Sequence, residues 1–173
     1  MTQPVFFYDL GSPACYLIAE QIGAALPEAA EWEPVHASGG EDFDRLAIEQ
    51  RVAELELQPV RWPSVWPPET RAAMLAATYA KQIGRTVAFS LAAFRQAFAG
   101  GRDLGDENTV LIAAAACEMH PTAVLKGISL RSTGAALDRA GERARAAGVR
   151  SVPAIQVGDQ VFYALEPAVG AYA

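Results

Sequence analysis

The apolar positions along the chain change from a strand pattern at both ends to a helical pattern in the middle. Residues 3–9 combine aromatic and β-branched side chains in a short run that predicts a buried strand. Ser12 and Pro13 then predict a helix over residues 13–25, because serine is a good N-cap and proline a good first helical residue. A second strand is expected over residues 32–36, which completes a parallel, right-handed β-α-β unit.

Helical spacing dominates the middle of the chain, and strands return at its end. Helices are expected at 42–57, 69–83, 86–99, 107–118, 121–129 and 132–147. The connection 58–68 is rich in tryptophan and proline and cannot be a regular helix. Strands are expected at 152–157 and 160–163, joined by a two-residue hairpin turn at Gly158-Asp159.

This order of elements predicts an α/β fold, with a thioredoxin-like core and a large all-α insertion. The core consists of the β-α-β unit and the final β-β hairpin. We expect residues 1–37 and 148–173 to form the thioredoxin-like domain and residues 38–147 to form the helical insertion domain.

The composition of the chain limits which binding partners and which cellular compartment are expected. The chain has 173 residues, 51% of them hydrophobic and 20% charged, so it can bury a sizeable core. A net charge of −6 without a dense Lys/Arg run argues against a nucleic-acid partner. The chain opens without a signal-like segment, and its apolar runs are too short to span a membrane. We therefore expect a soluble cytoplasmic protein, whose two cysteines form no disulfide framework.

The turn between the first strand and the first helix carries the candidate chemistry. Thioredoxin-like enzymes place a Cys-x-x-Cys dithiol at such a junction, where backbone N–H groups and the helix dipole stabilise a thiolate. Here Ser12 stands in the outer, attacking position and only the inner Cys15 keeps its sulfur. One thiol cannot cycle between a dithiol and an internal disulfide. The site could still bind a thiolate, but it is not expected to be a disulfide oxidant.

Two motifs at the expected separation carry a resemblance to a known family. Ser-Pro-Ala-Cys-Tyr-Leu at 12–17 follows Asp9, and Gly-Val-Arg-Ser-Val-Pro at 148–153 precedes the hairpin. In these motifs the chain resembles the DsbA-like branch of the thioredoxin superfamily, and is most similar to kappa-class glutathione transferases and 2-hydroxychromene-2-carboxylate isomerases. It departs from them at 67–70, where the family commonly has Pro-x-Asn-Ser/Thr, and at 163–167, where Trp-Gly-x-Asp-Arg is usual.

The resemblance implies a thiol-dependent transferase or cis–trans isomerase of an aromatic or unsaturated acid. Glutathione, or an equivalent low-molecular-weight thiol, would be the co-substrate, and Ser12 would donate a hydrogen bond to its thiolate. Val152 and Pro153 would be the superfamily's cis-proline pair, whose exposed backbone groups bind the thiol. Glu166 would bind the α-ammonium group of the thiol. A homodimer is also implied.

Each of these residues has a simpler explanation, and two other functions stay open. Ser12 could be only a helix cap, Pro153 a trans proline at the first residue of a strand, and Glu166 an ordinary surface residue. Trp62 and Trp66 could form an apolar wall for an aromatic substrate or a packed connection. Cys15 fits a small buried hydrophobe, or else the single thiol of a DsbA-like oxidoreductase or mixed-disulfide protein.

The last alternative is a non-catalytic thioredoxin-fold binding protein. The two histidines, His36 and His120, fit neither a catalytic triad nor a metal-ligand spacing, so no metal is expected.

Overall fold

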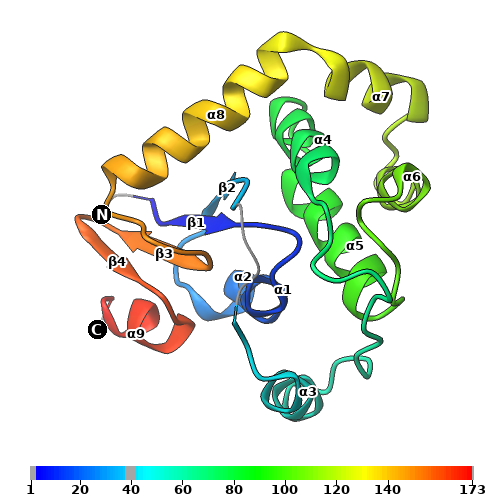
Figure 1. The fold of residues 1–173 in the computed structure, drawn as a ribbon. Helices are drawn as coiled ribbons and strands as arrows, with labels where there is room; N and C mark the ends of the chain where they lie inside the picture. The colour runs from blue at the N-terminus through cyan, green and yellow to red at the C-terminus, as the bar shows by residue number, and fades with distance from the viewer. Residues whose placement is uncertain (1–2, 38–41, 173) are drawn as a thin grey trace.

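The strands form one mixed sheet in the middle of the molecule. The computed structural model describes residues 3–37 and 42–172. In this part of the chain the sheet has four strands in the order β2-β1-β3-β4 (Figure 1). The strands are β1 (Val5–Tyr8), β2 (Glu31–Pro34), β3 (Ala154–Val157) and β4 (Gln160–Phe162).

The pairing of the strands confirms the predicted topology. β1 pairs with β2 in parallel, with Phe6 opposite Trp32, and pairs antiparallel with β3, with Phe6 opposite Ile155. β3 and β4 form the expected hairpin around Gly158-Asp159. The thioredoxin-like core with a helical insertion between β2 and β3 is therefore present as predicted.

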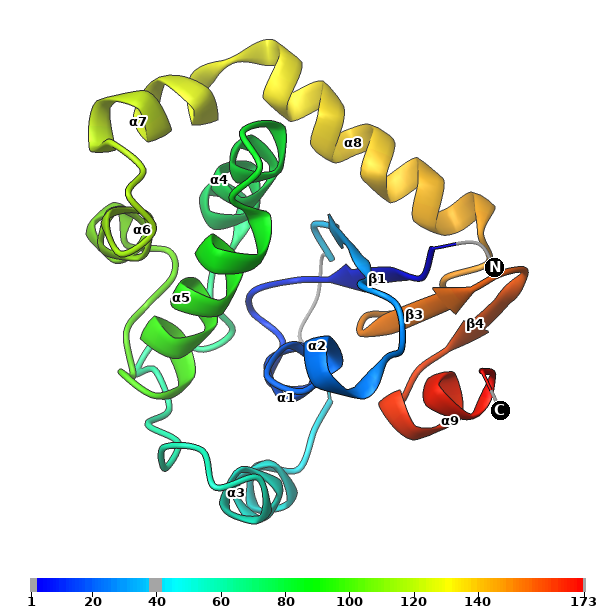
Figure 2. The same ribbon diagram turned by 180° about the vertical axis from the view of Figure 1, so that it is seen from behind.

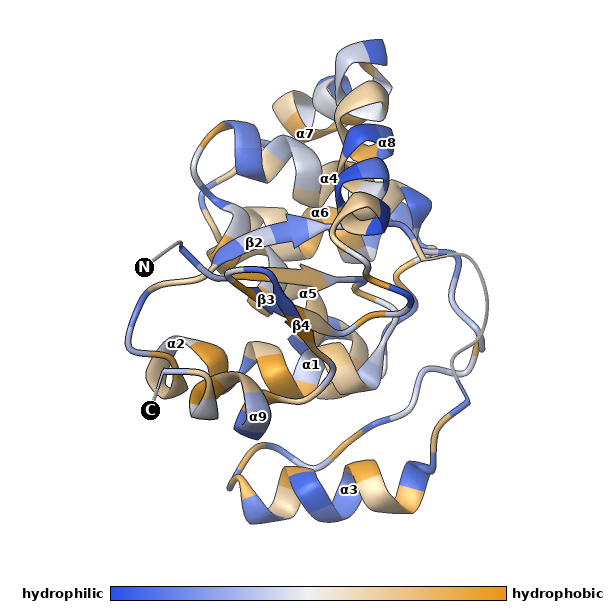
Figure 3. Cartoon of the chain, turned by 90° about the vertical axis from the view of Figure 1, so that its left-hand side faces the viewer, coloured by the Kyte–Doolittle hydropathy of each residue, from blue (hydrophilic) through white to orange (hydrophobic). Residues whose placement is uncertain are grey.

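Helices cover both sides of the sheet. Figure 3 shows α1, α2 and α9 on one side, and α4, α7 and α8 on the other. α3 lies beyond α1, as Figure 2 shows, and contacts it. The helices are α1 (Pro13–Ala19), α2 (Ile22–Ala25), α3 (Arg45–Glu54), α4 (Arg71–Gln82), α5 (Thr86–Phe98), α6 (Glu107–Ala115), α7 (Pro121–Ser129), α8 (Arg131–Ala146) and α9 (Leu165–Gly170).

The prediction of one helix over residues 13–25 is wrong, because the segment divides into α1 and α2. The Gln21 N–H donates to the carbonyl of Ile18 (3.0 Å) instead of continuing the α-helical ladder. The Gln21 side chain donates to the Leu17 carbonyl (2.7 Å). The turn also places the carboxylate of Glu20 against Arg95 of α5, with contacts of 2.7 and 2.8 Å. A contact across 75 residues thus accompanies the break.

Aromatic side chains connect the sheet to the insertion through one apolar core. Phe6, Phe7 and Tyr8 of β1 are fully buried. The Tyr8 ring lies 6.0 Å from the ring of Phe94 on α5. The hydroxyl of Tyr8 shares a hydrogen bond of 2.6 Å with Ser90, also on α5. These contacts position α5, and with it the helical block, against the central strand.

An ion cluster ties β2 to the two helices above it. Glu31 bonds to Lys81 of α4 (2.8 Å) and accepts two bonds from Arg143 of α8 (2.7 and 2.9 Å). Glu33 also pairs with both cations. Arg143 and Lys81 lower the pKa of Glu31 from its ordinary 4.5 to about 2. The insertion is therefore attached to the edge strand by charge as well as by apolar packing.

Candidate functional site

Ser12 occupies the N-cap of α1, as its sequence context predicts. Its Oγ accepts a hydrogen bond from the N–H of Cys15 (3.1 Å), and Pro13 is the first helical residue. Ser12 is buried, with 7% of its surface exposed. Capping uses a lone pair of the hydroxyl oxygen, whereas binding a thiolate uses its proton. The cap therefore does not itself use the part of the hydroxyl that a thiolate would need.

Asp9 holds the turn in front of Ser12, a role that the sequence analysis missed. Its carboxylate accepts from the N–H groups of Gly11 and Ala37, each at 2.8 Å, and from the Thr70 hydroxyl at 3.4 Å. Asp9 is 4% exposed, and burial raises its pKa while these hydrogen bonds oppose the rise. One carboxylate thus joins the turn, the end of β2 and the start of α4.

The segment before α4 packs closely on the same turn. A Cβ atom added at Gly11 would lie 2.7 Å from Cγ2 of Thr70 and 3.3 Å from Pro68. Glycine at position 11 is therefore what allows the two segments to approach. Nearby, Nε2 of His36 lies 3.8 Å from the carboxylate of Glu69. His36, expected to lack a catalytic or metal role, thus borders the turn.

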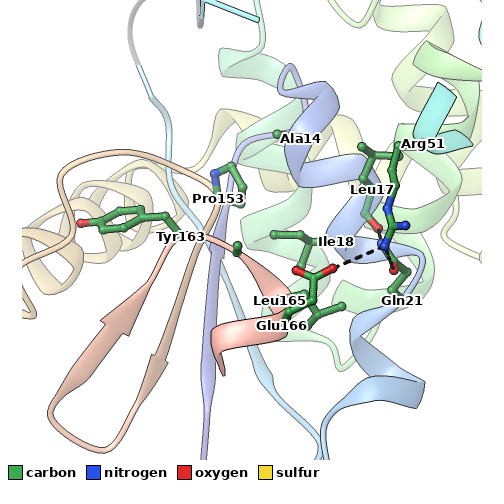
Figure 4. Close-up of a pocket in the computed structure, with 10 residues that line it drawn as sticks. Ala14, Leu17, Ile18, Gln21, Arg51, Pro153, Tyr163, Leu165 and Glu166 are labelled. Carbon is green, nitrogen blue, oxygen red and sulfur yellow. Dashed lines mark hydrogen bonds and ion pairs between the residues drawn. The ribbon is translucent and has the colours of Figure 1, made fainter. Parts of the chain in front are cut away.

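The proline pair faces the first helix across a small pocket. The Val152–Pro153 peptide bond is cis, as the resemblance implied, and the Trp66–Pro67 bond is also cis, which was not expected. Pro153 lines a pocket of about 180 Å³ together with Ala14 of α1 and Glu166 of α9 (Figure 4). The complete lining is Ala14, Leu17, Ile18, Gln21, Arg51, Pro153, Tyr163, Ala164, Leu165 and Glu166.

The pocket brings together only some of the predicted residues. Pro153 and Glu166 line it, and Ala14 belongs to the Ser-Pro-Ala-Cys turn. Cys15 and Val152 are sequence neighbours of the lining residues Ala14 and Pro153, and Ser12 precedes Ala14 by two residues. None of Ser12, Cys15 and Val152 lines the pocket. Arg51 was not anticipated, since it comes from the insertion and no local pattern distinguishes it from other exposed arginines.

Trp62 and Trp66 belong to an aromatic cluster away from this pocket. Their rings lie 6.0 Å apart, nearly perpendicular, and both contact Phe43. The guanidinium of Arg45 lies 4.9 Å from the centre of the Trp62 ring. The Trp62 indole N–H donates to Glu49 (2.6 Å). These contacts are those of a packed connection between helices. A role as the wall of a substrate site stays a prediction.

Both cysteines are buried. Cys15 is 0% exposed and Cys117 is 7% exposed, and burial raises the pKa of the Cys117 thiol. A thiol that attacks another molecule must be reachable and ionised. Cys15 therefore fits the interpretation as a small buried hydrophobe, and its geometry does not favour a single-thiol redox protein.

Neither a metal site nor a membrane-spanning helix is found in the described part of the chain. Within residues 3–37 and 42–172, no group of three or more histidine, cysteine or acidic side chains is placed to hold a metal ion. In the same part of the chain, no helix is both long and apolar enough to cross a membrane.

Comparison with known proteins supports the fold and the family. The family model of the DsbA-like thioredoxin domain matches residues 5–171. None of the curated proteins matches the sequence.

Similar solved structures include both isomerases and oxidoreductases. 2-Hydroxychromene-2-carboxylate isomerase has a TM-score of 0.84 and 13% identity, over 99% of this chain and 93% of that one. The probable DsbA oxidoreductase of Streptomyces coelicolor has a TM-score of 0.76 and 16% identity, over 99% and 88%. The oxidoreductase DsbA of Xylella fastidiosa has a TM-score of 0.64 and 14% identity, over 98% and 81%. At these identities the likeness is one of fold.

Proposed function

The chain belongs to the DsbA-like thioredoxin domain family, and within it we propose that the protein is a thiol-dependent isomerase or transferase rather than a disulfide oxidoreductase. The observation that carries the proposal is Ser12 in the position of the attacking cysteine, with the only nearby thiol, Cys15, fully buried. A serine hydroxyl is a poor nucleophile without a base, but it is a good hydrogen-bond donor to an anion. The nucleophilic sulfur must then come from a bound thiol such as glutathione.

The proposed reaction returns the thiol unchanged. The thiolate adds to the β-carbon of the conjugated double bond of an aromatic or α,β-unsaturated acid. A carbon–sulfur bond forms, the π-electron pair moves to the α-carbon and its conjugated carbonyl group, and the carbon–carbon double bond becomes a single bond. Rotation about that bond follows, and expulsion of the thiolate restores the double bond in the other configuration. If the adduct is protonated instead, the product is a thioether and the protein is a transferase. In both cases Ser12 stabilises the attacking sulfur by donating its proton in a hydrogen bond.

The pocket lined by Ala14 of the Ser-Pro-Ala-Cys turn supports a small charged thiol as the ligand. Its lining runs from Ala14, two residues after Ser12, to Glu166, the residue expected to bind an α-ammonium group. Of the solved structures, 2-hydroxychromene-2-carboxylate isomerase covers nearly the whole of this chain and is covered by it in turn. The compound in that enzyme's name, 2-hydroxychromene-2-carboxylate, is therefore the first electrophilic substrate to test.

The proposal is tested by titrating the protein with glutathione in a calorimeter and recording the ultraviolet absorbance of the thiolate. Saturable binding with thiolate present at neutral pH is expected. Protein and glutathione together should then bring the isomers of 2-hydroxychromene-2-carboxylate to equilibrium faster than either alone. Absence of binding at millimolar glutathione, or bound glutathione that stays a thiol, contradicts the proposal.

A further inference from the structure

A second cavity lies at the end of α1 that is remote from Ser12, between α2 and α5. Its volume is about 330 Å³, which is within the range of small-molecule pockets. Ile22 of α2 and Trp32 of β2 give it an apolar lining, and both side chains are almost fully buried. The cavity shares no lining residue with the pocket at Pro153, so the two are separate sites.

The cavity is a groove that follows one side of α5. Val87, Leu91 and Arg95 line it at intervals of four residues, which places them on one face of the helix. With a rise of 1.5 Å per residue, the distance from Val87 to Arg95 gives the groove a length of about 12 Å. On the side of α2, Gly23 and Ala24 line the groove, and nothing lies within 4 Å of a Cβ atom added at Gly23. These small residues leave the groove open.

One end of the groove carries a guanidinium group with unused donors. Nε and Nη2 of Arg95 bind the carboxylate of Glu20 at 2.7 and 2.8 Å. The Glu20 side chain is 8% exposed, whereas that of Arg95 is 55% exposed. A guanidinium has five N–H groups, and Nη1 of Arg95 makes no hydrogen bond within the described part of the chain. Glu20 therefore fixes the orientation of the guanidinium and leaves its outer edge able to bind a second acceptor.

We propose that this groove binds a carboxylic acid with an unbranched apolar chain, such as a medium-chain fatty acid. The carboxylate accepts hydrogen bonds from Arg95, and the chain lies over Trp32 and Leu91 towards Val87. Burial of the chain supplies most of the affinity, because Glu20 already balances the charge of Arg95. The guanidinium determines the direction in which the acid lies. This site is independent of the thiol chemistry proposed above.

The length of the groove determines which acids fit. An extended decanoate matches a groove of about 12 Å, whereas a shorter acid leaves part of the apolar lining in contact with water. Affinity should therefore rise with each methylene group up to the length of decanoate and then level off, because further carbon atoms extend beyond the groove. A flat apolar surface would show no such limit.

Calorimetry with a series of acids tests the site. Hexanoate, octanoate and decanoate should bind with affinities that rise by up to about fourfold for each methylene group, and dodecanoate should gain little more. Decanol, which lacks the carboxylate, should bind several-fold more weakly than decanoate. Decanoate should bind equally well in the presence and absence of glutathione, since the two sites are separate.

Two substitutions with a matched control test the location. Gly23→Leu places a side chain in the groove and should weaken the binding of decanoate at least tenfold. Gly134→Leu is the control, because nothing lies within 4 Å of a Cβ atom added at that position of α8 either, and it should leave the affinity unchanged. Glu20→Gln removes the negative charge beside Arg95, so it should tighten the binding of decanoate several-fold without tightening that of decanol. Melting curves confirm that each variant is folded.

Several results would overturn the inference. These are the absence of saturable binding at millimolar decanoate, an affinity in Gly23→Leu equal to that of the wild type, and equal binding of decanol and decanoate. Failure of Glu20→Gln to tighten binding would remove the role of Arg95, and displacement of decanoate by glutathione would place the acid in the other pocket. A dimer of the wild type that Gly23→Leu separates would show that a second copy of the chain occupies the groove instead.

Discussion

At the scale of the residue, the cap and the donor functions of Ser12 can be separated by substitution. Ser12→Ala removes the capping oxygen, which should lower the free energy of unfolding by about 1 kcal/mol, and also removes the proton offered to a thiolate. Ser12→Asp keeps an oxygen that can cap the N–H of Cys15 but has no proton to donate. Both variants should lose the thiolate absorbance of bound glutathione, while only Ser12→Ala loses the cap.

Thermal melting and glutathione titration of both variants give the comparison. If Ser12→Asp binds glutathione as well as the parent protein does, Ser12 is only a cap and the proposed function loses its central residue.

Asp9 should matter more for stability than its single charge suggests. Asp9→Ala leaves the N–H groups of Gly11 and Ala37 and the hydroxyl of Thr70 without their acceptor. The Thr70 hydroxyl is buried, whereas the bonds from Gly11 and Ala37 are only partly buried, so water can replace the lost acceptor there. A hydrogen bond to a charged group contributes about 1.5–3 kcal/mol, so the free energy of unfolding should fall by about 2–3 kcal/mol. Thr70→Val removes only the longest of the three bonds and should cost much less. Urea denaturation measures both, and equal losses would show that Asp9 is not the hub of the turn.

These two residues show what local sequence can reveal about a site. The N–H group that Ser12 caps is three residues away, so the cap can be predicted from the order Ser-Pro before a helix. Two partners of Asp9 lie 28 and 61 residues away, and nothing in the chain indicates that they converge. Arg51 is a similar case, because its distance from Glu166 along the chain is 115 residues.

At the scale of the element, the contact between α4 and α7 depends on a residue without a side chain. A Cβ at Gly127 would lie 2.5 Å from Cγ of the Tyr79 ring, and a ring cannot yield as a flexible chain end does. Gly127→Ala should therefore lower the free energy of unfolding by about 1–3 kcal/mol, despite the better helix propensity of alanine.

Gly134 provides the matched control for this substitution. It lies in α8, and nothing comes within 4 Å of a Cβ added there. Gly134→Ala should raise the stability by about 0.5–1 kcal/mol. Denaturant unfolding of both variants tests the pair. Two changes of the same sign would contradict the close approach of α7 to Tyr79.

The ion cluster on β2 should make the stability of the fold depend on pH in the acidic range. The pKa of Glu31 lies at about 2 in the folded protein and at its ordinary 4.5 when unfolded. Between these values the unfolded chain binds a proton that the folded one does not, so stability falls as the pH drops from 4.5 towards 2. Glu31→Gln should melt at a lower temperature at neutral pH and lose less stability across this window.

Glu142→Gln, at an exposed position beside Arg143, is the control for the acid titration. Its melting temperature should follow that of the wild type from pH 7 to pH 2. If Glu31→Gln loses as much stability as the wild type between pH 4.5 and pH 2, Glu31 is not the cause of the acid dependence.

Sequence patterns predicted the elements better than their ends. The periodicity of 121–129 gives α7 with the same bounds, because Pro121 and the end of the apolar spacing are local signals. The break between α1 and α2 has no such signal, since it accompanies the contact of Glu20 with Arg95 on another helix. Local patterns therefore identified the helices of the insertion, α3 to α8, but neither the division between α1 and α2 nor the long-range pairs that accompany it.

At the scale of the whole molecule, the two cysteines report on how the chain opens. Cys15 lies in α1 of the thioredoxin-like core and Cys117 lies in the insertion, and both side chains are buried. Alkylation of the native protein, followed by mass spectrometry, should be slow at both sites and should accelerate together as denaturant is added. Much faster labelling of Cys117 would show that the insertion opens alone, as two separate domains would. Fast labelling of Cys15 would instead revive the redox alternative.

The overall architecture was predictable because it depends on the order of strand and helix patterns, which is a local property. The division into two domains, the cytoplasmic location and the homodimer stay predictions. The shared aromatic core was not predictable, because the contact of Tyr8 with Ser90 joins residues 82 positions apart.

The insertion between β2 and β3 also has a consequence for synthesis on the ribosome. β1 can pair with β2 as soon as the first 34 residues have emerged, but its other neighbour, β3, begins at Ala154. Until then one side of a fully apolar central strand has no partner, and an unpaired apolar strand edge is a site of aggregation. The edge of β1 that pairs with β3 therefore stays unpaired while the whole helical block is translated, and the sheet is completed only when the last strands arrive.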